Sequence, residues 1–402
     1  MRKSIVYLNG YSQGSTATFC ATLSNLARKA GWFTCFIGPD PCVHGNAFDQ
    51  NFGVCKKGVQ HLISRGFTFL NDSECFANAR STRKLFDILD TVQPAIVHLN
   101  NLHGTYISFP KLVSYAAKRD IQLVWTLHDC WLATGRCCCF DMHGCMKWRE
   151  GCGACPHKNA TPKTLLDRSK QHWHLKHKIV DSTQNLVLCS PSQWLANILK
   201  QSKVEKAVSV YPNGINLDVF KPSQKDERVV KSALGRNVIG FVFARWTKEK
   251  GSDFAVELCN KIDHKKYFVV LVGAPDNLRL TNALVLPKAK SPKELRMLYS
   301  SFDVTANFTL EDNFPTINME SIACGTPVLT FDTGGSPESI KVGINGFVVR
   351  KGDVEAVIKC LPRILKLDRN IVAKSSIEFD ASTRYASYLH LYKRLLQSGK
   401  KG

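Results

Sequence analysis

The stretch EDNFPTINMESIACGTPV, residues 311–328, decides the fold of this chain. An apolar segment at 304–308 precedes it, and a second apolar segment at 327–331 closes it. Between them we expect a polar loop that turns at Pro315, followed by a helix that carries Glu320. A buried strand, a loop, a helix and another buried strand are typical of a parallel sheet covered on both faces.

The same alternation runs outward through the whole chain. Further strands are predicted at 5–8, 33–37, 94–99, 122–127 and 185–190 in the first half, and at 238–244 and 267–272 in the second. The sequence therefore predicts an α/β protein with two doubly wound, Rossmann-like domains that face each other across a cleft. We expect a first domain at 1–208, a second at 209–380 with a hinge near 210–215, and a C-terminal helix and tail at 381–402.

The composition excludes several classes of protein. A chain of 402 residues is too long for one ordinary core, and its hydrophobic content of 44% and charged content of 22% argue against wholesale disorder. No segment offers the roughly 20 consecutive apolar residues that a membrane-spanning helix needs. The short apolar run at the start is interpreted as a strand rather than a signal peptide, so we expect a cytoplasmic location.

The net charge of +21 calls for a polyanionic partner. Nucleic acid is disfavoured, because no zinc finger and no RNA-binding aromatic motif accompanies the basic residues. A phosphorylated small molecule and an anionic membrane surface remain, and the latter would place the protein peripherally on the inner face of the plasma membrane. A solvated helical face and a membrane patch are both open interpretations of one basic cluster, which comprises Lys158, Lys163, Arg168, Lys170, Lys176, Lys178, His172, His174 and His177.

Two acids in the deciding stretch have a chemistry that suits sugars. Asp312 and Glu320 are eight positions apart, one in the loop and one in the helix, so both side chains can enter the same cleft. A carboxylate accepts hydrogen bonds from two sugar hydroxyls, and its charge strengthens them. From the spacing alone, the alternative is a helix with two solvated acids that bind no ligand.

The whole stretch resembles the signature of the retaining GT-B glycosyltransferases of family 4, and more closely the branch of bacterial surface-polysaccharide assembly that reads Glu-Asp-Asn-Phe-Pro. The signature has an acid, seven residues and a glutamate before an Ala-x-Gly-x-Pro-Val segment. This chain departs from it in carrying Asp312 as the first acid, with Glu311 just before. The resemblance implies that Glu320 binds the donor ribose and that either Glu311 or Asp312 binds the donor sugar.

Other positions match the family in chain order and carry implied roles. Arg245 and Lys250 resemble the pair that grips the donor diphosphate, and His128 resembles the cleft histidine that contacts the transferred sugar. The remaining implied donor-binding positions are Gly14 and Ser15 in the first loop, and the loop residues Asn313, Phe314, Pro315 and Thr316.

The resemblance implies a retaining transfer of a hexose-type unit from a nucleotide-diphosphate sugar to a growing cell-surface glycan or a lipid-linked acceptor. It implies no cofactor and no metal in catalysis. Two further classes of function are weighed against it. One is a catalytically silent glycan-synthesis partner that binds nucleotide sugar, and the other is a GT-B-fold sugar-nucleotide epimerase.

The sixteen cysteines divide into two groups. Nine are scattered singly and are interpreted as small core residues. The others lie in a cysteine-rich insertion near 130–157, where Cys137, Cys145, Cys152 and Cys155 follow a C-x7-C-x6-C-x2-C spacing. A structural zinc ion, uncoordinated thiols and a disulfide are the alternatives for these four residues.

Overall fold

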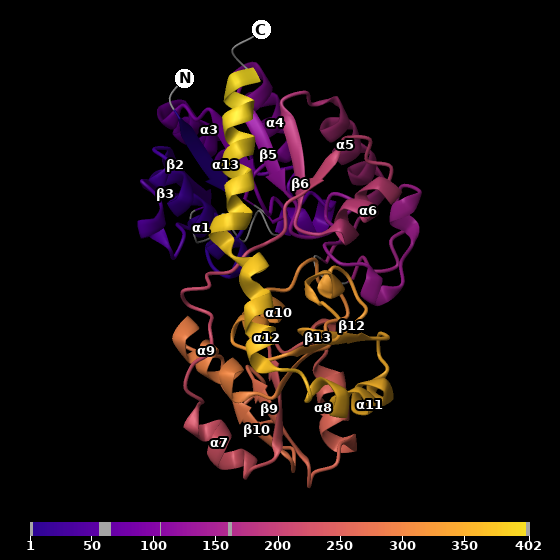
Figure 1. Cartoon of the computed structure of the whole chain (residues 1–402). Coiled ribbons are helices and arrows are strands. Elements are labelled where there is room, and N and C mark those ends of the chain that lie inside the picture. The colour runs from indigo at the N-terminus through magenta and orange to yellow at the C-terminus, as the bar shows by residue number, and fades with distance from the viewer. Residues whose placement is uncertain (1–2, 56–65, 105, 160–162, 399–402) are drawn as a thin grey trace. The chain divides into compact units, whose positions relative to one another are not determined.

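The structure is a computed structural model, and it describes residues 3–55, 66–104, 106–159 and 163–398 (Figure 1). The chain divides into two compact units. The first comprises Met1–Pro212 together with Tyr385–Gly402, and the second comprises Asn213–Arg384.

Each unit is built on one parallel sheet. The first sheet contains β1 (Ser4–Leu8), β2 (Phe33–Gly38), β3 (Gln50–Gly53), β4 (Ile96–Leu99), β5 (Gln122–Thr126), β6 (Leu186–Ser190) and β7 (Val208–Val210). The second contains β8 (Asn237–Val242), β9 (Tyr267–Val272), β10 (Ala283–Leu286), β11 (Val304–Asn307), β12 (Val328–Phe331) and β13 (Gly346–Val349). The predicted α/β fold with two Rossmann-like parallel sheets is confirmed.

Both sheets have the strand order of a doubly wound fold. The first runs β3-β2-β1-β4-β5-β6-β7 and the second runs β10-β9-β8-β11-β12-β13. In each, the chain starts at a central strand, winds to one edge and then crosses back to wind to the other. Ligands of such folds bind at the carboxyl ends of the two strands where the winding direction changes. These strands are β1 and β4 in the first unit, and β8 and β11 in the second.

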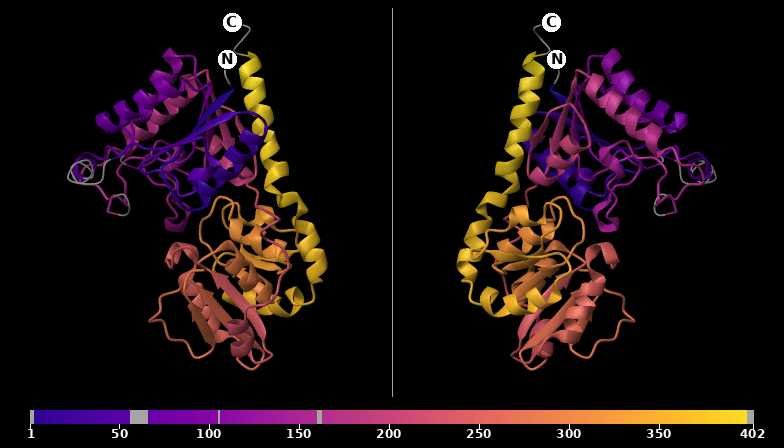
Figure 2. Two further views of the ribbon diagram at one scale, coloured as in Figure 1. Left: turned by 90° about the vertical axis from the view of Figure 1, so that its left-hand side faces the viewer. Right: turned by 90° about the vertical axis from the view of Figure 1, so that its right-hand side faces the viewer.

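The helices of the first unit cover both faces of its sheet (Figure 2). One face packs its buried aliphatic side chains against α3 (Ala79–Val92), α4 (Phe109–Lys118), α5 (Ser169–Ser182) and α6 (Gln193–Gln201). The other face carries Tyr7 and His98, and it meets α1 (Ser15–Lys29) and the long α13 (Ala381–Ser398). Buried Tyr388 and Tyr392 hold α13 to this sheet through bonds to Thr126 and His98.

The second unit has the same layered construction. One face of its sheet packs against α8 (Ser252–Lys261) and α11 (Val354–Ile364). The other packs against α7 (Glu227–Ala233), α9 (Pro292–Ser301), α10 (Thr316–Ala323) and α12 (Arg369–Ser375). Six 3₁₀ helices complete the described chain: η1 (Gly45–Ala47), η2 (Asp141–His143), η3 (Lys147–Arg149), η4 (Lys248–Lys250), η5 (Ser336–Ser339) and η6 (Ser376–Phe379).

None of the helices in the described residues is both long enough and apolar enough to cross a bilayer. The basic cluster requires a correction, because three of its nine members lie inside the first unit. Lys176 is 0% exposed, and His172 and His177 are also buried. These three share one face of α5 with Trp173 and Val180, and helical spacing turns that face towards the core. The cluster is therefore not a single solvated face.

Candidate functional site

The predicted residues of the second unit lie where its winding direction changes. Arg245 and η4 follow the end of β8, and Glu311 and Asp312 follow the end of β11. β8 and β11 are hydrogen-bonded neighbours, so these loops leave adjacent strands at the same edge of the sheet. The open ends of parallel strands and the first turns of the helices that follow them favour anionic ligands.

The structure brings Lys250 and Asp312 into direct contact. Lys250 Nζ donates a hydrogen bond to Asp312 Oδ2 at 2.5 Å, and both side chains keep part of their surface exposed, 34% and 25%. The backbone supports this pair, because the carbonyl of Glu249 accepts hydrogen bonds from Leu310 N at 2.8 Å and Thr309 Oγ1 at 3.2 Å. The two loops are thus tied together by backbone and side chains.

Two glycines permit this close approach. Gly251 has φ +84°, and a Cβ there would lie 2.3 Å from the Phe308 carbonyl oxygen. Gly334 has φ +57°, and a Cβ there would lie 2.1 Å from the Asp312 carbonyl oxygen, which also accepts a hydrogen bond from Gly335 N. Any larger residue at either position would push the loops apart.

Glu320 lies in α10 and is held by its neighbours. Tyr299 donates its hydroxyl hydrogen to Glu320 Oε2 at 3.0 Å. Burial raises the pKa of Glu320, and the hydrogen bonds from Tyr299 and Thr316 oppose that rise. A carboxylate with these partners is orientated to accept further hydroxyl hydrogens while it remains ionised.

The loop between Glu311 and α10 is partly a core element. The side chains of Glu311, Asn313 and Phe314 are buried, and Phe314 packs with Met319 and Ile322. Pro315 occupies the N-cap position of α10 and has no backbone N–H. Asp312 and Thr316 are half-buried, so Asp312 is the more exposed of the two neighbouring acids.

A buried amide that the sequence did not single out joins the two sides of this loop. Asn318 is 0% exposed, its Oδ1 accepts from Asn307 Nδ2 at 2.8 Å, and its Nδ2 donates to Ser336 and Ser339. It thereby fixes α10 to the end of β11 and to η5. Arg245, by contrast, is exposed, and the hydrogen bonds and ion pairs that the structure describes do not join it to Lys250 or Asp312.

The first unit presents its predicted loop at the equivalent point of its own sheet. Gly14 has φ +87° and is the N-cap of α1, where no side chain caps the helix, and Ser15 is exposed in its first turn. At the base of this loop, Gly10 N donates to the Asn101 carbonyl at 2.7 Å. The loops after β1 and β4 are thereby joined, and the first turn of α1 is left open to an anion.

His128 follows β5 in the same unit, and its surroundings define its chemistry. His128 Nε2 lies 2.9 Å from Asn100 Oδ1, and the Asn100 Nδ2 donates to the carbonyls of Leu8 and His98. The two carbonyls fix which end of the Asn100 amide faces His128, and that end is the oxygen. Because an amide oxygen can only accept a hydrogen bond, His128 Nε2 carries the hydrogen and Nδ1 is the acceptor. Burial lowers the pKa of His128 to about 4, so the ring is neutral at physiological pH.

A second pair beside His128 was missed by sequence reasoning. His103 Nε2 lies 2.7 Å from Asp129 Oδ2, while Asp129 Oδ1 accepts from Trp131 N at 2.9 Å. Burial of both groups opposes their ionisation, but their mutual attraction outweighs it, raising the pKa of His103 and lowering that of Asp129. Both residues line a small pocket with His128 at the ends of β4 and β5. Only the His128-Asp129 adjacency could have drawn attention to this pair.

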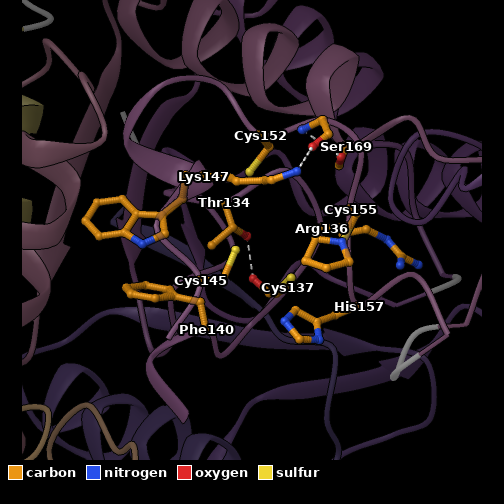
Figure 3. A pocket seen from close by; sticks show the side chains of 13 residues that line it. Thr134, Arg136, Cys137, Phe140, Cys145, Lys147, Cys152, Cys155, His157 and Ser169 are labelled. Carbon is orange, nitrogen blue, oxygen red and sulfur yellow. Dashed lines mark hydrogen bonds between the residues drawn. The ribbon is translucent and has the colours of Figure 1, made fainter. Parts of the chain in front are cut away.

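The four cysteines of the insertion line a separate pocket of the first unit, shown in Figure 3. All four are half-buried, whereas eight of the nine scattered cysteines are buried. Phe140 and Trp148 form an apolar wall, whereas Arg136 and Lys147 supply positive charge.

Comparisons with known proteins agree with this geometry. Residues 223–378 match the family model described as glycosyl transferases group 1, and this segment contains Arg245, Lys250, Asp312 and Glu320. The chain is also 24% identical over 325 residues to the putative colanic acid biosynthesis glycosyl transferase WcaC of Escherichia coli K12. That similarity covers 77% of this chain and 78% of the relative. These similarities identify residues 223–378 as a segment of the glycosyl transferases group 1 type.

Solved structures support the fold of this chain along almost its whole length. Sucrose-phosphate synthase from Thermosynechococcus elongatus is 15% identical and has a TM-score of 0.69, covering 99% of this chain and 100% of that one. Anabaena Alr3699/HepE in complex with UDP-glucose is 14% identical, with a TM-score of 0.66 and coverage of 98% and 99%. At these identities the likeness establishes the GT-B fold and leaves the ligands to be argued separately.

Proposed function

We propose that this protein is a glycosyltransferase that moves a sugar from a nucleotide-diphosphate sugar to a growing cell-surface glycan or lipid-linked acceptor, with retention at the anomeric carbon. The observation that carries the proposal is the contact between Lys250 and Asp312 where the winding direction of the second sheet changes. A cation and an acid held together there match the two ends of a diphospho-sugar, which carries anionic phosphates on one side and hydroxyls on the other.

The donor nucleotide is assigned to the second unit. Lys250 and Arg245 would neutralise the diphosphate, and Glu320 would accept hydrogen bonds from the ribose hydroxyls. Asp312 would bind hydroxyls of the sugar, since it is more exposed than Glu311. The complexes of Anabaena Alr3699/HepE with UDP-glucose and with UDP support this class of donor.

The reaction needs no covalent intermediate on the protein. The bond between the anomeric carbon and the leaving phosphate oxygen breaks, and the acceptor oxygen bonds to that carbon on the same face. The acceptor proton passes to the departing phosphate. Lys250 and Arg245 stabilise the negative charge that develops on the diphosphate, which makes their role largest in the transition state.

His128 is proposed to contact the transferred sugar. Its neutral ring offers Nδ1 as an acceptor for a sugar hydroxyl, because Nε2 is engaged by Asn100. The name of the Escherichia coli relative, which refers to colanic acid biosynthesis, supports a surface polysaccharide as the acceptor class. The net charge of +21 supports docking on an anionic membrane surface near a lipid-linked acceptor.

The proposal is tested by screening nucleotide sugars for thermal stabilisation, since a ligand that binds the native state raises the unfolding temperature by mass action. The best donor is then incubated with and without lipid-linked acceptors, and the anomeric configuration of the product is determined by NMR. Stabilisation by a donor that Glu320→Ala abolishes, followed by a retained linkage, is expected. An inverted linkage contradicts retention, and an epimerised donor formed without acceptor contradicts the transfer assignment.

Membrane docking has its own test. Co-sedimentation with vesicles should rise with the content of anionic lipid and fall with salt. Binding that ignores both variables would remove the membrane from the proposal without affecting sugar transfer.

A further inference from the structure

The cysteine pocket lies outside the machinery assigned to donor binding, so its purpose goes beyond the proposed function. Four cysteines from three separate turns of the chain line one pocket, and Figure 3 shows them with the neighbouring Arg136 and Lys147. The surrounding segment has little regular structure, because between β5 and α5 the described chain contains only the short helices η2 and η3. Cys145 and Cys152 pack against the core of the first unit, but core packing does not require four thiols around one pocket.

The backbone beside each cysteine is fixed by hydrogen bonds. Thr134 Oγ1 donates to the Cys137 carbonyl at 2.5 Å, and Cys145 N donates to the Phe140 carbonyl at 3.4 Å. Cys152 N donates to the Lys147 carbonyl at 2.9 Å, and Cys155 N donates to Asp167 Oδ2 at 2.6 Å. The backbone at each of the four cysteines is therefore held in place by the chain itself.

The turn at 151–154, which leads into Cys155, has an unusual backbone. Gly151, Cys152, Gly153 and Ala154 have φ of +122°, +56°, +98° and +44°, and two of these four residues are not glycine. Lys147 Nζ holds this turn by donating to the carbonyls of Gly153 at 3.2 Å and Ala154 at 2.7 Å. Consecutive left-handed residues persist only where the surroundings determine them, and they gather at binding sites.

The sulfur atoms have the polar contacts expected of ligands. Cys152 Sγ accepts a hydrogen bond from Gly135 N at 3.1 Å. The sulfurs of Cys137 and Cys155 are hydrogen-bonded to each other. Arg136 and Lys147 beside them would balance the charge that several thiolates bring to a divalent ion.

We propose that Cys137, Cys145, Cys152 and Cys155 bind one structural zinc ion that fastens the insertion of the first unit. Zinc prefers four ligands in tetrahedral geometry, takes thiolates readily and commonly uses a C-x2-C pair such as Cys152 and Cys155. The ion would stabilise the segment that follows His128, and it takes no part in the transfer of the sugar. Tetrahedral binding places sulfurs roughly 3.8 Å apart, so the side chains would close on the ion within the frame that the backbone supplies.

Another group of potential ligands competes for this assignment. Within the described residues, His103, Asp129 and Cys138 place ligand atoms within 4.8 Å of one another. In that group, His103 and Asp129 already satisfy each other at 2.7 Å. The cysteine pocket is favoured because its four ligands share one chemistry.

The first test is the zinc content of the full chain, purified without chelator from zinc-sufficient medium. About one zinc per chain is expected, and clearly sub-stoichiometric zinc would overturn the proposal. Protein produced in cobalt-supplemented medium should show the intense absorption of tetrahedral cobalt and a thiolate-to-cobalt charge-transfer band. A weak absorption spectrum of the octahedral type would contradict the tetrahedral site. This measurement uses the wild-type protein, so it does not depend on the folding of a variant.

Matched variants then locate the ion. Cys145→Ser should lose the bound zinc, whereas Cys139→Ser, at an exposed neighbour that does not line the pocket, should retain it. If Cys145→Ser retained its zinc and Cys138→Ser lost it, the ion would belong to the group of His103, Asp129 and Cys138. That result would overturn the assignment. An intact mass lower by two hydrogens in unreduced, zinc-free protein would indicate a disulfide instead, which also overturns it.

Discussion

Asp312 and Lys250, separated by 62 positions in the chain, meet at 2.5 Å because two neighbouring strands of the second sheet end side by side. Lys250 ends η4, and Asp312 belongs to the loop after β11. Their contact converts two separate loops into one site with a positive and a negative group. The predictions for the donor follow from this arrangement.

Removing the positive charge of the pair should impair catalysis more than donor binding. In Lys250→Ala we expect kcat to fall about 100-fold or more, because charge stabilisation at the leaving group is greatest in the transition state. Steady-state transfer assays with saturating donor measure this change. Lys248→Ala is the matched control, since Lys248 lies two residues away, is 79% exposed and pairs with Asp253. Equal losses in the two variants would contradict the assigned role of Lys250.

The affinity for the donor should depend on pH through Glu320. Its pKa is raised, chiefly by burial, so the carboxylate becomes protonated at a higher pH than an exposed glutamate does. Because the ribose hydroxyls need an ionised acceptor, affinity should be full above this pKa and decline as the pH falls through it. Calorimetric titration of donor across a pH series measures the midpoint.

Tyr299→Phe provides the complementary variant for Glu320. The Tyr299 hydroxyl stabilises the ionised form, so removing it should move the midpoint to higher pH. Glu320→Gln should bind weakly and lose this pH dependence altogether. A midpoint unchanged in Tyr299→Phe would show that the tyrosine does not tune the carboxylate.

The activity should show no inflection from His128 across neutral pH. Burial lowers its pKa to about 4, so the ring stays neutral from mildly acidic to alkaline conditions. His128→Ala should reduce kcat about 100-fold, while His44→Ala, at an exposed histidine of the same unit, should have little effect. The pH profile of kcat at saturating donor provides the measurement.

Asn100→Asp tests the tautomer of His128 directly. A carboxylate at 100 would favour the protonated ring and raise its pKa, which removes the acceptor at Nδ1. A new loss of activity towards low pH should then appear in the profile. A profile identical to wild type would contradict the role of Nδ1 as the acceptor.

The strands that the sequence predicted and those it did not differ in position within the sheets. The unpredicted strands β3, β7, β10 and β13 are the outermost strands of the two sheets. Central strands such as β9 are buried at every residue, which gives a continuous apolar run, whereas β3 and β7 contain no buried residue. Apolar runs therefore predicted the middle of each sheet, because only there does burial require them.

The candidate site divides in a similar way. Asp312, Glu320, Lys250 and Arg245 belong to short motifs, so a resemblance was sufficient to predict them. The groups that orientate the site lie far away in the chain: Tyr299 is 21 positions from Glu320, and Asn100 is 28 positions from His128. Such partners have no fixed spacing, since the layering of strands and helices alone brings them together.

The last prediction concerns the backbone that supports Asp312. In Gly334→Ala, the added Cβ would meet the Asp312 carbonyl oxygen at 2.1 Å, and φ of +57° adds strain. The loop must shift, so donor affinity should fall together with stability, the latter by more than about 1 kcal/mol. Gly343→Ala separates these two causes, because Gly343 also has a positive φ, +78°, but nothing lies within 4 Å of its added Cβ. It should lose some stability and keep full donor affinity, as measured by thermal unfolding and calorimetry. Should Gly334→Ala bind donor as tightly as Gly343→Ala, the position of the Asp312 loop would not control the donor site.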